Sequence, residues 1–142
     1  MPVRLTCVAS MKSYDPVIDQ SPPFDERRLS PVAQKAVYRV LASWNCTDDE
    51  AARLLGVEPD RWAAIGDGDF QRSLNRDQLM RASYLIGIYS GLRVFSDETA
   101  KRWPKLPNTG PLFLGKTPVE FMLEGGLDAM EKTRRYTETI GY

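Results

Sequence analysis

The residue types that catalysis and metal binding most often need are scarce in this chain. Histidine is absent, which removes imidazole bases, Ser-His and Cys-His nucleophile pairs, and imidazole metal ligands. Two cysteines, Cys7 and Cys46, lie far apart and form no CxxC motif. We therefore expect two reduced thiols rather than a zinc site.

The remaining polar motifs are better explained as helix starts and turns. The paired carboxylates Asp48-Asp49 and Asp67/Asp69 fall where helices are expected to begin or chains to turn. The Gly66-x-Gly68 pair lacks the strand and following helix of a nucleotide-binding loop. The sequence thus predicts no catalytic residue, no metal site and no cofactor, and it favours a binding protein over an enzyme.

The overall charge argues against a strongly basic nucleic-acid binder. The 142 residues include 19 basic and 19 acidic ones, for a formal net charge of zero. A zero net charge does not exclude a basic face on one part of the surface. The length is enough for one domain or two small packed ones. No apolar run approaches the ~20 residues that span a bilayer, and residues 1–13 lack a signal core. We expect a cytoplasmic protein.

Helical spacing and cap signals predict an all-α fold of about seven helices. We divide the chain into an N-terminal extension (1–29) without assigned function, a helix-turn-helix region with a long central helix (30–95), and a small helical domain (96–142). The first helix is expected to start at Ser30, with Pro31 at its first position. The large side chains expected in the core are Trp44, Leu54, Leu55, Trp62, Leu79, Leu85, Ile86 and Trp103.

A helix-turn-helix is indicated between residues 47 and 66. Thr47 and Glu50 form a capping-box pair, and Gly56 can take the left-handed conformation that ends the first helix. Val57 then packs back, and Trp62 anchors the second helix. This unit resembles the Xre-type motif.

DNA binding by this unit is expected to be weak. On the second helix only Arg61 can donate to a base edge or a phosphate, with Arg53 and Arg72 as further phosphate contacts. Acidic residues slightly outnumber basic ones between Ser30 and Gly91, and phosphate attraction supplies most of the affinity of such modules. Two readings stay open: a DNA reader strengthened by assembly, or a helix-turn-helix kept as scaffold.

The second half of the chain alternates helices with proline and glycine breaks. Asn75 caps the longest helix, expected over residues 75–95. A short helix follows from Ser96 or Asp97 and is expected to end at Pro104. Thr117 caps another, the Gly125-Gly126 pair stops it, and a last helix runs over about residues 127–139 with a thin apolar face. Such a thin face favours burial against a partner.

The order of motifs in this half resembles the toxin-binding domain of the Xre/ParS/MbcA antitoxins. The motifs are Trp103, the Pro107-Asn108 turn, the Gly115-x-Thr117-Pro118 helix start, Gly125-Gly126 and the terminal Ile140-Gly141, preceded by the helix-turn-helix. Pro104 departs from the family, which tends to have a non-proline apolar residue there. The resemblance implies a RES-domain toxin as partner, an enzyme that acts on NAD, and an antitoxin that covers its NAD pocket.

The resemblance also implies where the toxin is bound. The C-terminal end of such antitoxins contributes to the block, and a homodimer within a hetero-oligomer is expected, with operator DNA as a further partner and no membrane. The residues predicted to bind the toxin are Phe121, Met122, Met130, Arg134, Tyr136, Ile140, Gly141 and Tyr142. The alternative function is a DNA-binding repressor or adaptor that has no toxin partner.

Overall fold

A computed structural model describes residues 26–140 and confirms an all-α fold. Within this part of the chain there are six α-helices, one short 3-10 helix and no strand. None of the described helices is long and apolar enough to cross a membrane. The elements are α2 (Glu26–Ser43), α3 (Asp48–Leu55), α4 (Pro59–Gly66), α5 (Arg76–Arg93), α6 (Asp97–Arg102), η2 (Trp103–Lys105) and α7 (Pro118–Thr139).

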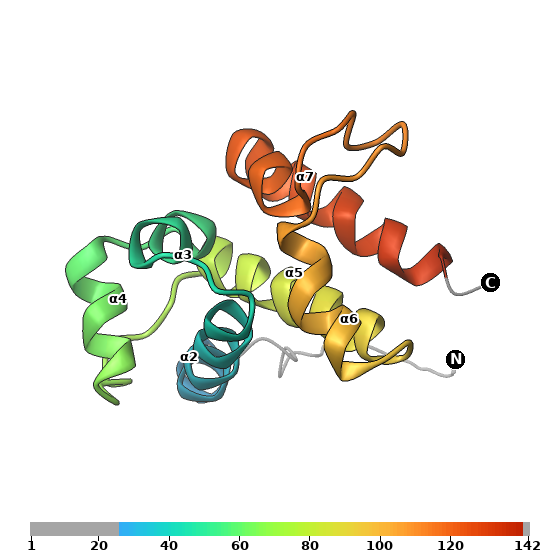
Figure 1. The fold of residues 1–142 in the computed structure, drawn as a ribbon. Coiled ribbons are helices and arrows are strands. Elements are labelled where there is room, and N and C mark those ends of the chain that lie inside the picture. Colours follow the sequence, from blue (N-terminus) through green and yellow to red (C-terminus); the bar gives the residue numbers. More distant parts are fainter. Residues whose placement is uncertain (1–25, 141–142) are drawn as a thin grey trace, which may run out of the picture.

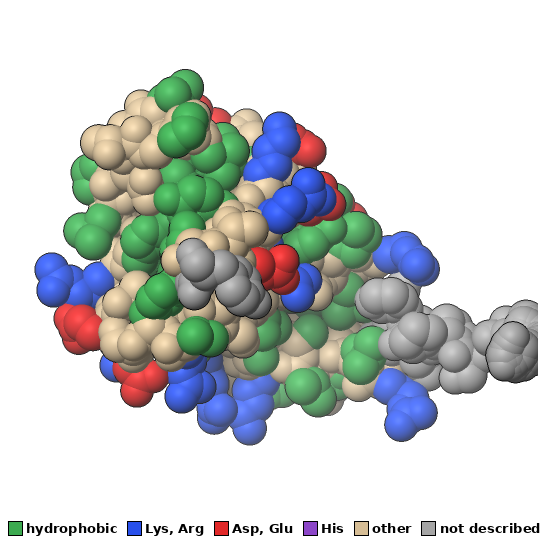
Figure 2. All heavy atoms as spheres, turned by 90° about the vertical axis from the view of Figure 1, so that its right-hand side faces the viewer, with side chains coloured by type: hydrophobic (Ala, Val, Ile, Leu, Met, Phe, Trp, Pro, Cys, Tyr) green, Lys and Arg blue, Asp and Glu red, His purple; other side chains and the backbone are tan. Residues whose placement is uncertain are grey.

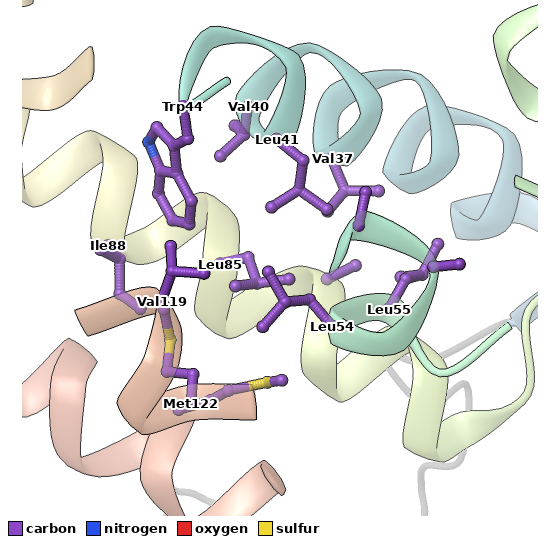
Figure 3. Close-up of a cluster of buried hydrophobic side chains, with 14 of the residues drawn as sticks. Val37, Val40, Leu41, Trp44, Leu54, Leu55, Leu85, Ile88, Val119 and Met122 are labelled. Atoms are coloured by element: carbon purple, nitrogen blue, oxygen red, sulfur yellow. The ribbon is translucent and has the colours of Figure 1, made fainter. Parts of the chain in front are cut away.

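The long helix α5 joins the two halves of the molecule. Helices α2, α3 and α4 lie on one side, α6 and α7 lie on the other, and α5 runs between them (Figure 1). Its Asn75 cap is confirmed, with a complete capping box to Gln78. Leu85 and Ile88 of α5 meet Leu41 and Trp44 of α2 in a continuous apolar core (Figure 3).

The expected start of the first helix is wrong. Helix α2 begins at Glu26, so Ser30 and Pro31 lie inside it. Ser30 is buried, and its hydroxyl accepts hydrogen bonds from the Leu74 backbone N–H (2.7 Å) and from Gln34 Nε2 (2.8 Å). A residue that local sequence suits for capping is here used to hold the segment before α5 against α2.

The α3–α4 unit forms as predicted. Thr47 and Glu50 make both capping-box hydrogen bonds, and Gly56 takes the left-handed conformation with φ of 83°. Trp62 is buried and lies against Tyr38 of α2, with ring centroids 4.9 Å apart. These contacts dock α4 on α2 and fix the hairpin in the fold.

Of two expectations about the C-terminal half, one needs correction. The short helix forms as expected: Ser96 caps α6, which ends at Arg102 just before the proline, and the chain then tightens into η2, in which Pro104 is buried. The face of the last helix is not thin, because Ala129, Met130, Thr133 and Thr137 are all buried. Packing of this helix therefore does not require a partner.

The predicted break at the glycine pair is confirmed as a kink. Helix α7 consists of two helical segments joined at Gly126, whose φ of 68° and ψ of −145° are open mainly to glycine.

Six of the eight predicted core side chains are buried, whereas Ile86 and Trp103 are half-buried. Both sit on the edge of the core, where one face of the side chain stays at the surface.

Candidate functional site

The arginine predicted to read DNA is a structural residue. The Arg61 side chain points inward, and the residue is only 6% exposed. Its guanidinium donates to Gln34 Oε1 (2.8 Å), to the carbonyl of Arg72 and, at 3.4 Å, to the carbonyl of Asp69. Burial lowers the pKa of Arg61, Arg72 lowers it further and Asp69 opposes the shift. The prediction that Arg61 lies on the exposed side of the second helix is wrong.

Gln34 extends this polar cluster to the segment between α4 and α5. Its Nε2 donates to the carbonyl of Arg72 (2.9 Å) and to that of Phe70 (3.5 Å). Backbone carbonyls that are shielded from water need hydrogen-bond donors from the protein. Arg61 and Gln34 therefore serve the fold by holding residues 69–74 against α2 and α4.

Without Arg61, the exposed surface of α4 is poor in positive charge. Glu58 and Asp60 are exposed at its start. Arg53 is exposed on α3 beside Asp49, 3.9 Å away, and Arg72 is exposed on the following segment. The structure thus leaves two of the three predicted DNA contacts accessible but does not gather them around a basic recognition helix.

In the C-terminal half, four aromatic rings fasten the long connection between η2 and α7. Phe113 is the centre: its ring lies 5.6 Å from Trp103, 5.3 Å from Phe121 and 5.2 Å from Tyr136, each edge to face. Trp103 also stacks on Tyr136 at 6.0 Å. These residues come from η2, the connection and both segments of α7. The cluster holds them together as one unit, which we call the C-terminal unit (residues 97–140).

The residues predicted to bind a toxin do not form a single exposed patch. Met122 and Met130 are fully buried in the core, so their assignment to a surface is wrong. Phe121 and Tyr136 are half-buried in the aromatic cluster, with the rest of each side chain at the surface. Ile140 is exposed. Gly141 and Tyr142 lie outside the described residues.

The position of the Arg134 side chain depends on Gly87 of α5. A β-carbon on Gly87 would come within 2.5 Å of Arg134 Nε, so the arginine lies directly over the glycine backbone. Nε is 3.5 Å from Glu138 Oε2, in ion-pair range but without hydrogen-bond geometry. The side chain is partly exposed and fixed on one side, which is consistent with either a packing or a contact role.

Sequence reasoning missed an exposed apolar site on the connection before α7. Leu112, Leu114 and Phe121 line a hollow of about 240 Å³ together with Lys116 and Glu124. Leu114 is 79% exposed and has φ of 53°, a conformation that leucine adopts rarely. The Leu112-Phe113-Leu114 run indicated only an apolar tether. Which of the three residues faces inward depends on turns that involve Gly110 and Gly115, and these cannot be read from hydropathy.

Other apolar side chains are exposed in this half of the molecule. Figure 2 shows the side of the molecule on which α7 ends, where hydrophobic side chains lie between groups of charged ones. The large apolar residues exposed in this half are Val94, Phe95, Leu106, Leu114 and Ile140.

Among the described residues, no group of His, Cys, Asp or Glu could hold a metal ion. Burial raises the pKa of the Cys46 thiol to about 12, with Lys105 opposing and Glu50 adding to the shift. The thiol therefore stays protonated near neutral pH and is a poor nucleophile.

Comparisons with known proteins do not assign the chain to a family. No family model, no curated protein and no solved structure matches it.

Proposed function

We propose that this protein is an antitoxin that binds a RES-domain toxin and blocks its NAD site. The observation that carries the proposal is the C-terminal unit. Three motifs of the resemblance have structural tasks within it: Trp103 belongs to the aromatic cluster, Thr117 and Pro118 start α7, and Gly126 bends it. A fold alone does not give a function, so the proposal depends on the surface that these residues help to present.

The buried positions of Met122 and Met130 change the proposed toxin contacts. Affinity would come from the exposed apolar hollow of Leu112, Leu114 and Phe121, since buried apolar area at the centre of an interface contributes most binding energy. Phe113, which also lines this hollow, packs against Tyr136 of α7, and α7 continues from Tyr136 toward Ile140. The tail from Ile140 to Tyr142 would enter the NAD pocket. A cytoplasmic location, a homodimer within the complex and the lack of enzymatic activity belong to the same proposal.

The alternative, a DNA-binding repressor or adaptor without a toxin, draws support from the α3–α4 hairpin with its left-handed glycine. The acidic start of α4 and the internal use of Arg61 weigh against strong operator binding by a single copy. We rank operator binding as a secondary activity that would require the avidity of an assembled complex.

The decisive experiment separates binding from inhibition. The full chain and a variant lacking residues 140–142 are each co-purified with a RES-domain toxin, sought first among the products of neighbouring genes, and NAD consumption by equal amounts of complex is measured. We expect the truncated protein to remain bound while toxin activity returns, because few atoms are needed in the substrate site. Full inhibition by the truncated protein would reject the tail as the blocking element.

Affinity is tested with a surface variant and a matched control. Leu114→Ser should weaken capture of the toxin without affecting folding, because Leu114 has few contacts to lose in the free protein. Val32→Ser, at an exposed apolar position on α2, should leave capture unchanged. Failure of the full chain to capture any RES-domain protein would refute the antitoxin proposal and leave the repressor as the remaining candidate.

A further inference from the structure

A cleft between the end of α2 and the α6–η2 segment is lined in part by polar groups that have no partner among the described residues. It encloses about 630 Å³ and is lined by residues 42–45 on one side and by residues of 98–106 on the other. Pockets of this size hold small ligands or a few residues of a peptide. The cleft is on a different part of the surface from the apolar hollow of Leu112, Leu114 and Phe121, and no residue lines both.

Trp44 brings an unused hydrogen-bond donor to this cleft. The residue is fully buried and contributes to the cleft lining, yet its Nε1 has no hydrogen-bond partner. Figure 3 shows the nitrogen on the edge of the ring that faces away from Leu41 and Val37. A buried N–H without an acceptor costs free energy, so such groups call for a ligand or a water.

The charges around the cleft favour an anion of limited size. Lys101 is exposed and has no ion-pair partner among the described residues. Arg102 is paired with Glu98 at 3.4 Å, and Lys105 is committed to Glu50 Oε1 at 2.9 Å. Among the cations that line the cleft, Lys101 is therefore the one without an acidic partner among the described residues, and the Trp44 N–H is an additional neutral donor.

We propose that this cleft binds a carboxylate from a short acidic segment of a protein. One carboxylate oxygen would accept the Trp44 indole N–H, and the other would pair with Lys101. Because Nε1 has almost no accessible surface in the free protein, neighbouring side chains must shift on binding. This site is independent of the proposed toxin interface.

A nucleic-acid backbone fits the same cleft poorly. Glu98 is exposed and lines the cleft, and Asp48 and Asp49 are exposed at the start of α3, shortly after the lining residue Asn45. A chain of phosphates that extends through the cleft would meet Glu98, whereas a single side-chain carboxylate need not. Like charges near a binding site disfavour an extended polyanion more than a compact anion.

The test follows the Trp44 indole signal by ¹H–¹⁵N NMR. The full-length protein contains three tryptophans, and Trp44→Phe identifies which indole resonance belongs to Trp44. If that variant does not fold, Trp62→Phe and Trp103→Phe identify the signal by elimination. The labelled protein is titrated with a capped six-residue peptide that carries a single glutamate among glycines and serines, with inorganic phosphate and with a short DNA duplex.

We expect the peptide to shift the Trp44 indole signal in a saturable manner. Lys101→Gln should weaken the peptide about fivefold, the loss expected for one partly exposed ion pair. Lys35→Gln is the matched control, because Lys35 is an exposed lysine on α2 that does not line the cleft, and it should not change the affinity. Peptide binding with this pattern supports the site.

Three results would overturn the proposal. The first is an indole signal that the peptide does not move, which would mean that the donor is satisfied by water alone. The second is an equal loss of affinity in Lys101→Gln and Lys35→Gln, which would indicate non-specific attraction. The third is a shift caused by phosphate or by the DNA duplex at concentrations equal to or below those of the peptide, which would assign the cleft to phosphate groups.

Discussion

The two halves of the molecule keep their elements in place by different means. Around α2–α5 the core is aliphatic, with Leu41, Leu54 and Leu85 fully buried, and a buried arginine ties the loop before α5 to two helices. In the C-terminal unit four rings surround one connection, and three of those rings remain half-exposed.

This difference indicates where an interaction surface can arise. The N-terminal half uses its most promising cation, Arg61, inside the fold, so its outer face loses the charge that DNA would need. The C-terminal unit needs its aromatic residues for packing but leaves leucines of the same connection in solvent. Binding surface in this protein is therefore what remains after local packing is satisfied, and among the described residues most of the large exposed apolar side chains lie in the second half.

The largest expected effect tests the N-terminal core. Trp62→Ala should lower the free energy of unfolding by roughly 3–5 kcal/mol, because a buried ring is removed and a cavity remains beside Tyr38. Chemical denaturation followed by circular dichroism measures the change. A loss below about 1 kcal/mol would show that the ring is not part of the core.

The next test concerns the buried arginine. Arg61→Met should cost about 2–3 kcal/mol, since Gln34 Oε1 and the carbonyl of Asp69 lose a charged donor while staying buried or partly buried. Arg53→Ala, at an exposed position, should change stability by less than about 0.5 kcal/mol. Equal effects of the two substitutions, in parallel urea titrations, would contradict the internal role of Arg61.

A smaller effect is expected at the kink that shapes the C-terminal unit. Gly126→Ala should cost about 1–3 kcal/mol, because alanine is strained at the φ and ψ that Gly126 adopts. Thermal unfolding gives the stability change. An unchanged or higher midpoint would mean that α7 can straighten without loss, and that the kink is not required by packing.

The smallest expected effect is a pH dependence that links the two halves. Burial alone would raise the pKa of Glu50, but hydrogen bonds from Thr47 and Lys105 and the charge of Lys105 lower it below its usual value of 4.5. Because the folded pKa is depressed, this contribution is present above the unfolded pKa and is lost as pH falls through the folded one.

Glu50→Gln should therefore reduce stability by less than about 1 kcal/mol at neutral pH and by less still in acid, since the carboxylate is partly exposed. Unfolding titrations at neutral pH and below the usual carboxyl pKa measure both values. Asp49→Asn serves as the control on the same helix, where the ion pair to Arg53 is long and exposed. A difference between wild type and Glu50→Gln that grows in acid would contradict the assigned pKa direction.

Local sequence determined most of the helices and several of their ends. The capping box at Thr47, the caps at Asn75 and Thr117, the left-handed Gly56 and the break at Gly126 all follow from interactions within a few residues, and each is confirmed. The all-α class and most of the expected core follow from helical periodicity. The partner, the operator and the dimer stay predictions, since they concern molecules beyond this chain.

Only the tertiary structure decided which side chains are used up by the fold. Ser30 has the local features of a cap but bonds to Leu74, and Arg61 lies on an apparently polar position but reaches Gln34. Met122 and Met130 are buried because the kink at Gly126 and the packing of α7 on α5 turn them inward. Caps depend on neighbours three or four residues away, whereas burial of a long side chain depends on residues tens of positions distant. Most helix caps could therefore be predicted from the sequence alone, whereas the burial of Arg61, Met122 and Met130 could not.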